Sequence, residues 1–211
     1  MAEPQTLRAD ARRNRDQIVA AAKVLFAERG PDAPMEEIAR QAGVGVGTLY
    51  RRFPDREALI QEVARDSLAV LVAHAQKARA EGGQGWESFL KVLETLPELW
   101  FTLRLTILSQ GDPVVIRHDP QGVATGEQLV STLDDLVRDG QEAGTLRADV
   151  STADMVMLIT LVISGLRSSS GALPDAAHAR MLALGLDGLR ATAHTPLPGR
   201  PLDIDEIGGK H

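Results

Sequence analysis

Apolar residues near the start of the chain recur with the period of an α-helix. Four of them stand at positions i, i+4, i+7 and i+8 and therefore share one helix face: Ile18, Ala22, Leu25 and Phe26. The Gly-Pro pair at residues 30–31 ends the pattern, because glycine accepts a left-handed backbone and proline cannot continue a helix. The spacing predicts an amphipathic helix over residues 10–29.

Three further helices are predicted before residue 81. Two short segments, 35–42 and 46–52, are separated by a turn at Gly43-Val44. Pro54 disfavours helix at the residue before it, and Asp55 is a good N-cap for a long helix over residues 56–80. The expected inward stripe of this long helix consists of Leu59, Ile60, Val63, Ser67, Val70 and Leu71.

The rest of the chain also shows helical period and no convincing period-two strand. The predicted helices are 86–96, 97–110, 121–142, 152–169 and 175–193. Residues 195–211 carry three prolines and are expected to form an extended or mobile tail. The predicted fold class is all-α, with about nine helices.

Residues 35–53, MEEIARQAGVGVGTLYRRF, predict a helix-turn-helix, in which two short helices meet at a glycine-containing turn. Small residues keep the start of the second helix slim enough to enter the major groove of DNA, which is about 12 Å wide. Hydroxyl and guanidinium groups then follow on the same helix. The candidate DNA contacts are Gly45, Val46, Gly47, Thr48, Tyr50, Arg51 and Arg52.

Net charge alone argues against a nucleic-acid partner, because the 211 residues carry a formal charge of −6. The charge is uneven, however. Residues 1–56 hold 10 Lys/Arg and 8 Asp/Glu, whereas residues 57–211 hold 13 and 21. This asymmetry suggests two tasks in one chain, with the basic side chains concentrated around the helix-turn-helix.

The stretch from residue 12 to residue 63 resembles the TetR family of bacterial transcriptional regulators. The matching features, in order, are the LFAERG helix end, the IARQAGV turn, GTLYRRF and the capped EAL start of the fourth helix. The resemblance implies a homodimeric repressor that binds double-stranded operator DNA and is released by a small-molecule effector.

Several residue roles follow from this resemblance. Thr48 and Tyr50 match positions that contact phosphate or bases, and Gly47 matches a position of close backbone approach. Arg51 and Arg52 stand where phosphate contact is typical, and Arg56 matches a lysine that holds the DNA backbone.

The chain also departs from the family pattern at two places. Gly45-Val46 replaces a frequent Ser-Lys pair, and Ala33-Pro34 replaces a frequent Thr-Thr pair, which removes one phosphate-binding hydroxyl. Four arginines at the N-terminal end of the chain are candidates to compensate for the missing hydroxyl, as a mobile arm: Arg8, Arg12, Arg13 and Arg15.

The family resemblance further implies a C-terminal helical domain that binds a ligand and dimerises through its last two helices. Residues 129–154 resemble the AGTLRAD-containing stretch that often precedes this interface. The candidate interface residues are Met157, Leu161, Leu182 and Leu186. The candidate ligand-binding residues are Trp86, Phe89, Trp100, Phe101, Arg104, His118 and Arg167. The expected domains are 1–55 for DNA binding, 56–194 for ligand binding and dimerisation, and 195–211 for the tail.

Other classes of protein find little support in the sequence. The chain has no cysteine, its five histidines form no metal-ligand spacing, and no catalytic frame is visible, so we expect no metal, no cofactor and no enzymatic activity. No secretory signal or membrane-spanning segment is visible, which makes the cytoplasm the expected location. Two alternatives remain open, a DNA-binding regulator without a ligand and a small helical enzyme.

Overall fold

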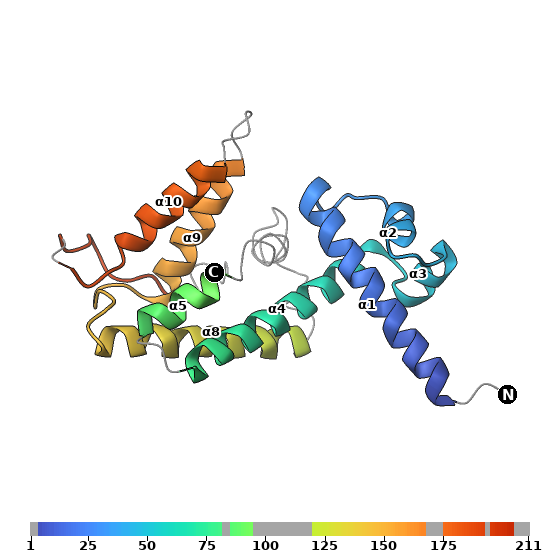
Figure 1. Ribbon diagram of the computed structural model, residues 1–211, viewed down its shortest axis with the longest axis horizontal. Coiled ribbons are helices and arrows are strands. Elements are labelled where there is room, and N and C mark those ends of the chain that lie inside the picture. The colour runs from blue at the N-terminus through green and yellow to red at the C-terminus, as the bar shows by residue number, and fades with distance from the viewer. Residues whose placement is uncertain (1–3, 82–84, 95–119, 168–174, 193–194, 205–211) are drawn as a thin grey trace. The chain divides into compact units, whose positions relative to one another are not determined.

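The protein is all-α in every part that the structure describes (Figure 1). The computed structural model describes residues 4–81, 85–94, 120–167, 175–192 and 195–204. Its helices are α1 (Pro4–Arg29), α2 (Met35–Gln41), α3 (Val46–Arg52), α4 (Arg56–Ala80), α5 (Gly85–Glu94), α8 (Pro120–Glu142), α9 (Thr152–Arg167) and α10 (Asp175–Asp187). The helix predicted over residues 97–110 lies outside the described residues.

The chain divides into two compact units, called here the N-terminal and the C-terminal unit. The boundary falls within α4, between Val70 and Leu71, and within α8, between Thr125 and Gly126. The first turns of α4 therefore pack with α1, α2 and α3. The domain boundary after residue 55 remains a prediction, since compactness alone does not define a functional domain.

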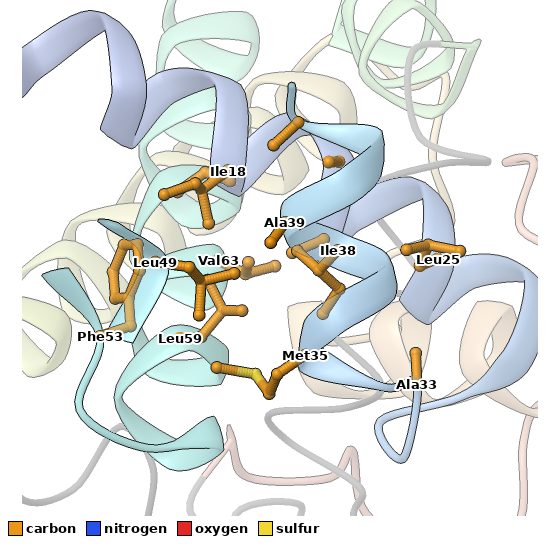
Figure 2. Packing of buried hydrophobic residues seen from close by; sticks show 14 of the residues in the cluster. Ile18, Leu25, Ala33, Met35, Ile38, Ala39, Leu49, Phe53, Leu59 and Val63 are labelled. Carbon is orange, nitrogen blue, oxygen red and sulfur yellow. The ribbon is translucent and has the colours of Figure 1, made fainter. Parts of the chain in front are cut away.

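The N-terminal unit is held together by one apolar cluster, which α1, α2, α3 and the start of α4 enclose (Figure 2). As predicted, Ile18, Ile38, Leu49 and Leu59 are completely buried, whereas Ile60 and Val70 of the predicted α4 stripe are only half-buried. Leu49 and Phe53 stand at i and i+4 and reach this core from α3 and its C-cap. Burying such side chains stabilises a fold by about 1.5–3 kcal/mol each, so this cluster fixes the position of α3.

The turn between α2 and α3 is set by Gly43, whose φ of 68° lies in the left-handed region. The Gly43 N–H donates to the Arg40 carbonyl at 3.1 Å, and the Val44 N–H donates to the Ala39 carbonyl at 3.0 Å. This is a Schellman motif, which ends α2 and satisfies two of its free carbonyl groups. Val44 then packs against the core, so the turn directs the chain into α3 at a defined angle.

The start of α1 differs from the sequence prediction. α1 begins at Pro4 rather than at residue 10. Proline is well suited to the first turn of a helix, and no helix-breaking residue follows it. The predicted start of α2 at residue 35 is confirmed, and Pro34 is its N-cap, with φ −62° and ψ 132°. The predicted N-cap of α4 is confirmed, since a carboxylate oxygen of Asp55 accepts the Ala58 N–H at 2.8 Å.

In the C-terminal unit, α9 and α10 lie side by side (Figure 1). α10 ends at Asp187, so the prediction of a helix to residue 193 is wrong at its C-terminal end. The residues that follow pair instead with the segment after α8, through an antiparallel bridge between Leu146 and Arg190. Gly185 and Gly188 lower the helix propensity here, and the bridge supplies other hydrogen-bond partners for the backbone.

A buried arginine joins three segments of the C-terminal unit. The Arg147 guanidinium donates to both carboxylate oxygens of Asp149, at 2.6 and 2.8 Å. It also donates to the Gly188 carbonyl at 3.2 Å and to the Thr195 carbonyl at 3.1 Å. Arg147 thus connects the end of α8, the end of α10 and the start of the tail. We refer to these contacts as the Arg147 junction.

Candidate functional site

The helix α3 has one buried side and one exposed side. Leu49 is completely buried, whereas Tyr50 and Val46 are 41% and 39% exposed. Arg51 and Arg52 are exposed as well. The exposed side of this short helix therefore presents a phenol hydroxyl, two guanidinium groups and one apolar side chain.

Arg51 and Arg52 make no ion pair with a carboxylate within the described residues. Other cations of the N-terminal unit do, since Lys23 meets Asp66 at 2.6 Å and Glu37 bridges two arginines. Arg51 donates instead to the Thr48 hydroxyl, at 3.4 Å on the same helix. Two exposed guanidinium groups without carboxylate partners keep their full charge available to a polyanion such as DNA.

The start of α3 carries little side-chain material. Gly45 is the N-cap, with φ −67° and ψ 143°, and its carbonyl accepts the Thr48 N–H at 2.8 Å. Gly45 and Gly47 are both exposed, and Thr48 is half-buried. Within residues 45–47, Val46 alone projects a side chain, which agrees with the slim helix start expected from the sequence.

Arg56 links two segments of the N-terminal unit by hydrogen bonds. Its Nη1 donates to the carbonyl oxygens of Pro31 and Ala33, at 2.6 and 2.5 Å. These contacts tie the turn between α1 and α2 to the first residue of α4. The structure thus gives Arg56 a packing role, and its contact with the DNA backbone remains a prediction.

The predicted basic arm is wrong, because its arginines do not precede the first helix but form part of α1. Arg12 and Arg13 are exposed on that helix. Arg15 is occupied by carboxylates, with its guanidinium 2.7 Å from both Asp16 and Glu62. Of the described side chains of this set, only Arg12 and Arg13 are therefore exposed candidates for contact with DNA.

Ion pairs between α1 and α4 are a feature that the sequence reading missed. Arg15 pairs with Glu62, and Lys23 pairs with Asp66 at 2.6 Å. Partial burial tends to lower the pKa of Arg15, but hydrogen bonds to Asp16 and Glu62 and the nearby carboxylate charges outweigh it and raise that pKa. The spacing of these residues in the sequence is consistent with both ion pairs. The two cations, eight residues apart, share a face of α1, and the two carboxylates, four residues apart, share a face of α4.

Family comparisons agree with this geometry. Residues 18–63 match a model described as bacterial regulatory proteins of the tetR family. Residues 114–191 match a model described as the C-terminal domain of SbtR-like transcriptional regulators. The first match spans the helix-turn-helix and the buried cluster that positions it.

Solved structures extend the similarity to most of the chain. A TetR transcription regulatory protein from Mycobacterium vanbaalenii is 34% identical over 87% of this chain and 99% of its own, with a TM-score of 0.57. The chain belongs to the TetR family of transcriptional regulators. A TetR regulator from Streptomyces coelicolor is similarly close, at 35% identity over 85% and 99% of the two chains, also with a TM-score of 0.57.

More distant relatives of this TetR-family regulator share less. An HTH-type transcriptional regulator of Staphylococcus aureus is 34% identical over 82 residues, which is 38% of this chain and 44% of the relative. The chain thus matches less than half the length of the curated relatives. The Mycobacterium smegmatis regulator LfrR, solved in complex with proflavine, is 19% identical, with a TM-score of 0.62 over 87% of this chain, and shares the fold.

The predicted ligand-binding residues of the TetR-family regulator are only partly described. Trp86 and Phe89 on α5 are buried, with ring centroids 5.9 Å apart. Nothing is described for Trp100, Phe101, Arg104 and His118, which lie outside the described residues. Arg167 ends α9, and its side chain also lies outside them.

Trp86 borders an open pocket of about 470 Å³ between α5 and α10. Its other lining residues are Leu90, Arg180, Ala183, Leu184, Leu186, Asp187 and Arg190. The Arg190 guanidinium lies over the Trp86 ring, 5.5 Å from its centroid. The Trp86 indole N–H is buried and has no acceptor within the described residues. The pocket therefore combines apolar walls with two guanidinium groups and one carboxylate.

The predicted dimer residues lie on the paired helices α9 and α10. Leu161 is 61% exposed, whereas Met157, Leu182 and Leu186 are half-buried. Leu184, another apolar residue of α10, is 58% exposed. Large apolar side chains that form a contiguous exposed patch are typical of surfaces that another chain covers.

Neither a membrane-spanning helix nor a metal site is found among the described residues. No described helix combines the length and the apolar character needed to cross a membrane. Within the same residues, no three histidine, aspartate or glutamate side chains gather closely enough to hold a metal ion.

Proposed function

We propose that this TetR-family regulator is a repressor that binds a palindromic operator as a homodimer and is released by a small-molecule effector. The observation that carries the DNA-binding part is the exposed side of α3, where Tyr50, Arg51 and Arg52 follow a slim helix start. Two such helices related by a two-fold axis enter successive major grooves, about 34 Å apart. Phosphate contacts supply much of the affinity and fix the register on the duplex.

Dimerisation through α9 and α10 is supported by their exposed leucines and by Met181, which is 40% exposed. Exposing several large apolar side chains to water is unfavourable for a monomer. A two-fold interface buries the same side chains on both chains. Four helices, two from each chain, then form a bundle.

Release by an effector is supported by the pocket beside Trp86 and by the LfrR structure, in which a fold relative holds proflavine. The effector acts by binding better to the form of the dimer that does not fit the operator. A difference of about 1–3 kcal/mol between the two forms lowers operator affinity by 5- to 150-fold. Compounds that bind the regulator without changing its operator affinity would contradict this part of the proposal.

Selection of bound fragments from random DNA, followed by gel-shift titration, tests the DNA-binding part. Tyr50→Ala is expected to weaken operator binding by about 1–3 kcal/mol, because the phenol contacts phosphate or a base edge. Arg51→Ala is expected to reduce the slope of log affinity against log salt by about 1, because one phosphate contact is lost.

Arg138→Ala provides the matched control. Arg138 is exposed on α8 and pairs with Asp135, so the substitution removes the same charge from the C-terminal unit. If Arg138→Ala and Arg51→Ala change the salt slope equally, Arg51 contributes only net charge and its assigned contact is wrong.

A further inference from the structure

Val46 is an exposed apolar residue at the first position of α3. Its side chain is 39% exposed, and it is not part of the buried cluster that holds the helix-turn-helix together. Valine is also a weak helix former, because its branched side chain loses rotamer freedom in a helix. Neither the packing of the N-terminal unit nor helix propensity therefore explains a valine at this position.

Gly47 is equally unexplained by the chain itself. Its φ does not lie in the left-handed region, and a Cβ built at this position meets nothing within 4 Å. Gly45 is similar, since a Cβ there meets only the Thr48 hydroxyl, at 3.9 Å. Glycine within a helix destabilises it relative to alanine by about 1 kcal/mol, so the reason for Gly47 lies outside the folded chain.

These observations have one common explanation if α3 enters the major groove. The first residues of a recognition helix are those that reach the base edges. Two glycines around Val46 leave its isopropyl group as the only side chain over that stretch, and they let the helix backbone approach the duplex closely. Arg51 and Arg52, exposed and without carboxylate partners in the described part of the chain, supply the charge that holds the helix against phosphate.

A valine side chain can recognise only one feature of the major groove. Base edges there present hydrogen-bond donors and acceptors, and thymine adds a C5-methyl group, the one apolar group among the four bases. A valine set against guanine or cytosine leaves polar edge atoms without partners, which is unfavourable. We propose that Val46 reads a thymine in each operator half-site through its C5-methyl group. This inference rests on the proposed function, because it requires operator binding by α3.

The test removes the methyl group from the DNA rather than from the protein. Once the operator has been selected from random DNA, each thymine of the half-site is replaced in turn by deoxyuridine, which differs only in lacking the C5-methyl. At one thymine position the replacement is expected to weaken binding by about fourfold, and by about 15-fold when made in both half-sites, as one buried methyl per site predicts. Replacement of thymines elsewhere in the site leaves the affinity unchanged.

A double-mutant cycle assigns the methyl to Val46. In Val46→Ala, which keeps the helix because alanine is the better helix former, the deoxyuridine penalty is expected to fall below about twofold. Val24→Ala is the matched control, since Val24 is 45% exposed on α1, and this variant must retain the full penalty.

The possible failures are distinguishable. If no DNA sequence is selected, the proposed function itself fails, and the inference fails with it. If an operator is bound but contains no thymine in its half-sites, tolerates deoxyuridine throughout, or shows the same penalty in Val46→Ala, the inference is overturned while operator binding stands.

Discussion

Ser67 is a residue whose burial opposes stability. It lies on the inward stripe of α4 and is completely buried, and its hydroxyl has no hydrogen-bond partner within the described residues. A buried hydroxyl without a partner carries a desolvation penalty of about 1–3 kcal/mol. Neighbouring stripe residues such as Leu59 and Val63 carry no such penalty.

Ser67→Ala is therefore expected to raise the free energy of unfolding by about 1 kcal/mol, measured by urea denaturation. Thr132→Val is the control, because the Thr132 hydroxyl donates to the Gln128 carbonyl at 2.8 Å and its removal brings no such gain. A loss of stability in Ser67→Ala would mean that the hydroxyl is hydrogen-bonded, for instance to a buried water.

Individual residues show which parts of the candidate site can be predicted from the sequence and which cannot. The exposure of Tyr50 and the burial of Leu49 follow from helical periodicity alone. Arg56 shows the limit, because nothing in its local sequence reveals that Nη1 meets two carbonyl groups more than 20 residues earlier. Contacts between distant segments depend on tertiary packing, which local patterns do not encode.

The bounds of α3 and α4 agree with the sequence prediction almost to the residue. Their bounds are set by residues next to the helices themselves, which are the caps Gly45 and Phe53 of α3 and Asp55 of α4. The end of α10 was missed because the segment after it pairs with residues near Leu146, more than 40 positions earlier. The tail is partly described, and its Leu202 N–H donates to Asp154 on α9 at 3.2 Å. A proline count does not reveal such a contact.

The stability of the Arg147 junction is expected to depend on pH, because the junction contains the Asp149 carboxylate. Hydrogen bonds from Arg147, together with one from the Leu197 N–H, hold the pKa of Asp149 well below its ordinary value. Because the folded-state pKa is the lower one, the stability that Asp149 contributes is complete above the ordinary carboxyl value and is lost as pH falls below it.

Asp149→Asn is therefore expected to lower the melting temperature at pH 7, and the difference from the unsubstituted protein should shrink between about pH 5 and pH 3. Thermal denaturation over this range provides the measurement. Asp134→Asn, which removes an exposed carboxylate from α8, should show no comparable change. A constant difference at every pH would mean that the Asp149 charge does not stabilise the junction.

On the scale of the whole molecule, the proposed dimer depends on the apolar surface of α9 and α10. Leu161→Arg with Leu184→Arg is expected to give a monomer by light scattering, because each charge would have to be buried without a partner. Both leucines are more than half exposed, so the monomer should keep its fold.

Val24→Arg controls for the loss of an exposed apolar residue, since Val24 lies on α1 in the N-terminal unit. This variant should remain dimeric. If the double variant on α9 and α10 also remains dimeric, the interface lies elsewhere on the molecule.

The helix α4 belongs to both compact units, and its length determines how far one end moves when the helix tilts. Its 25 residues, at 1.5 Å each, make it about 37 Å long. A tilt of about 5° at one end of such a helix moves the other end by about 3 Å. Successive base pairs of DNA are about 3.4 Å apart along the axis, so this displacement is close to one base-pair step. In the proposed operator complex, an angular change of a few degrees, well within the range over which packed helices vary, would be enough to move α3 out of register with its half-site.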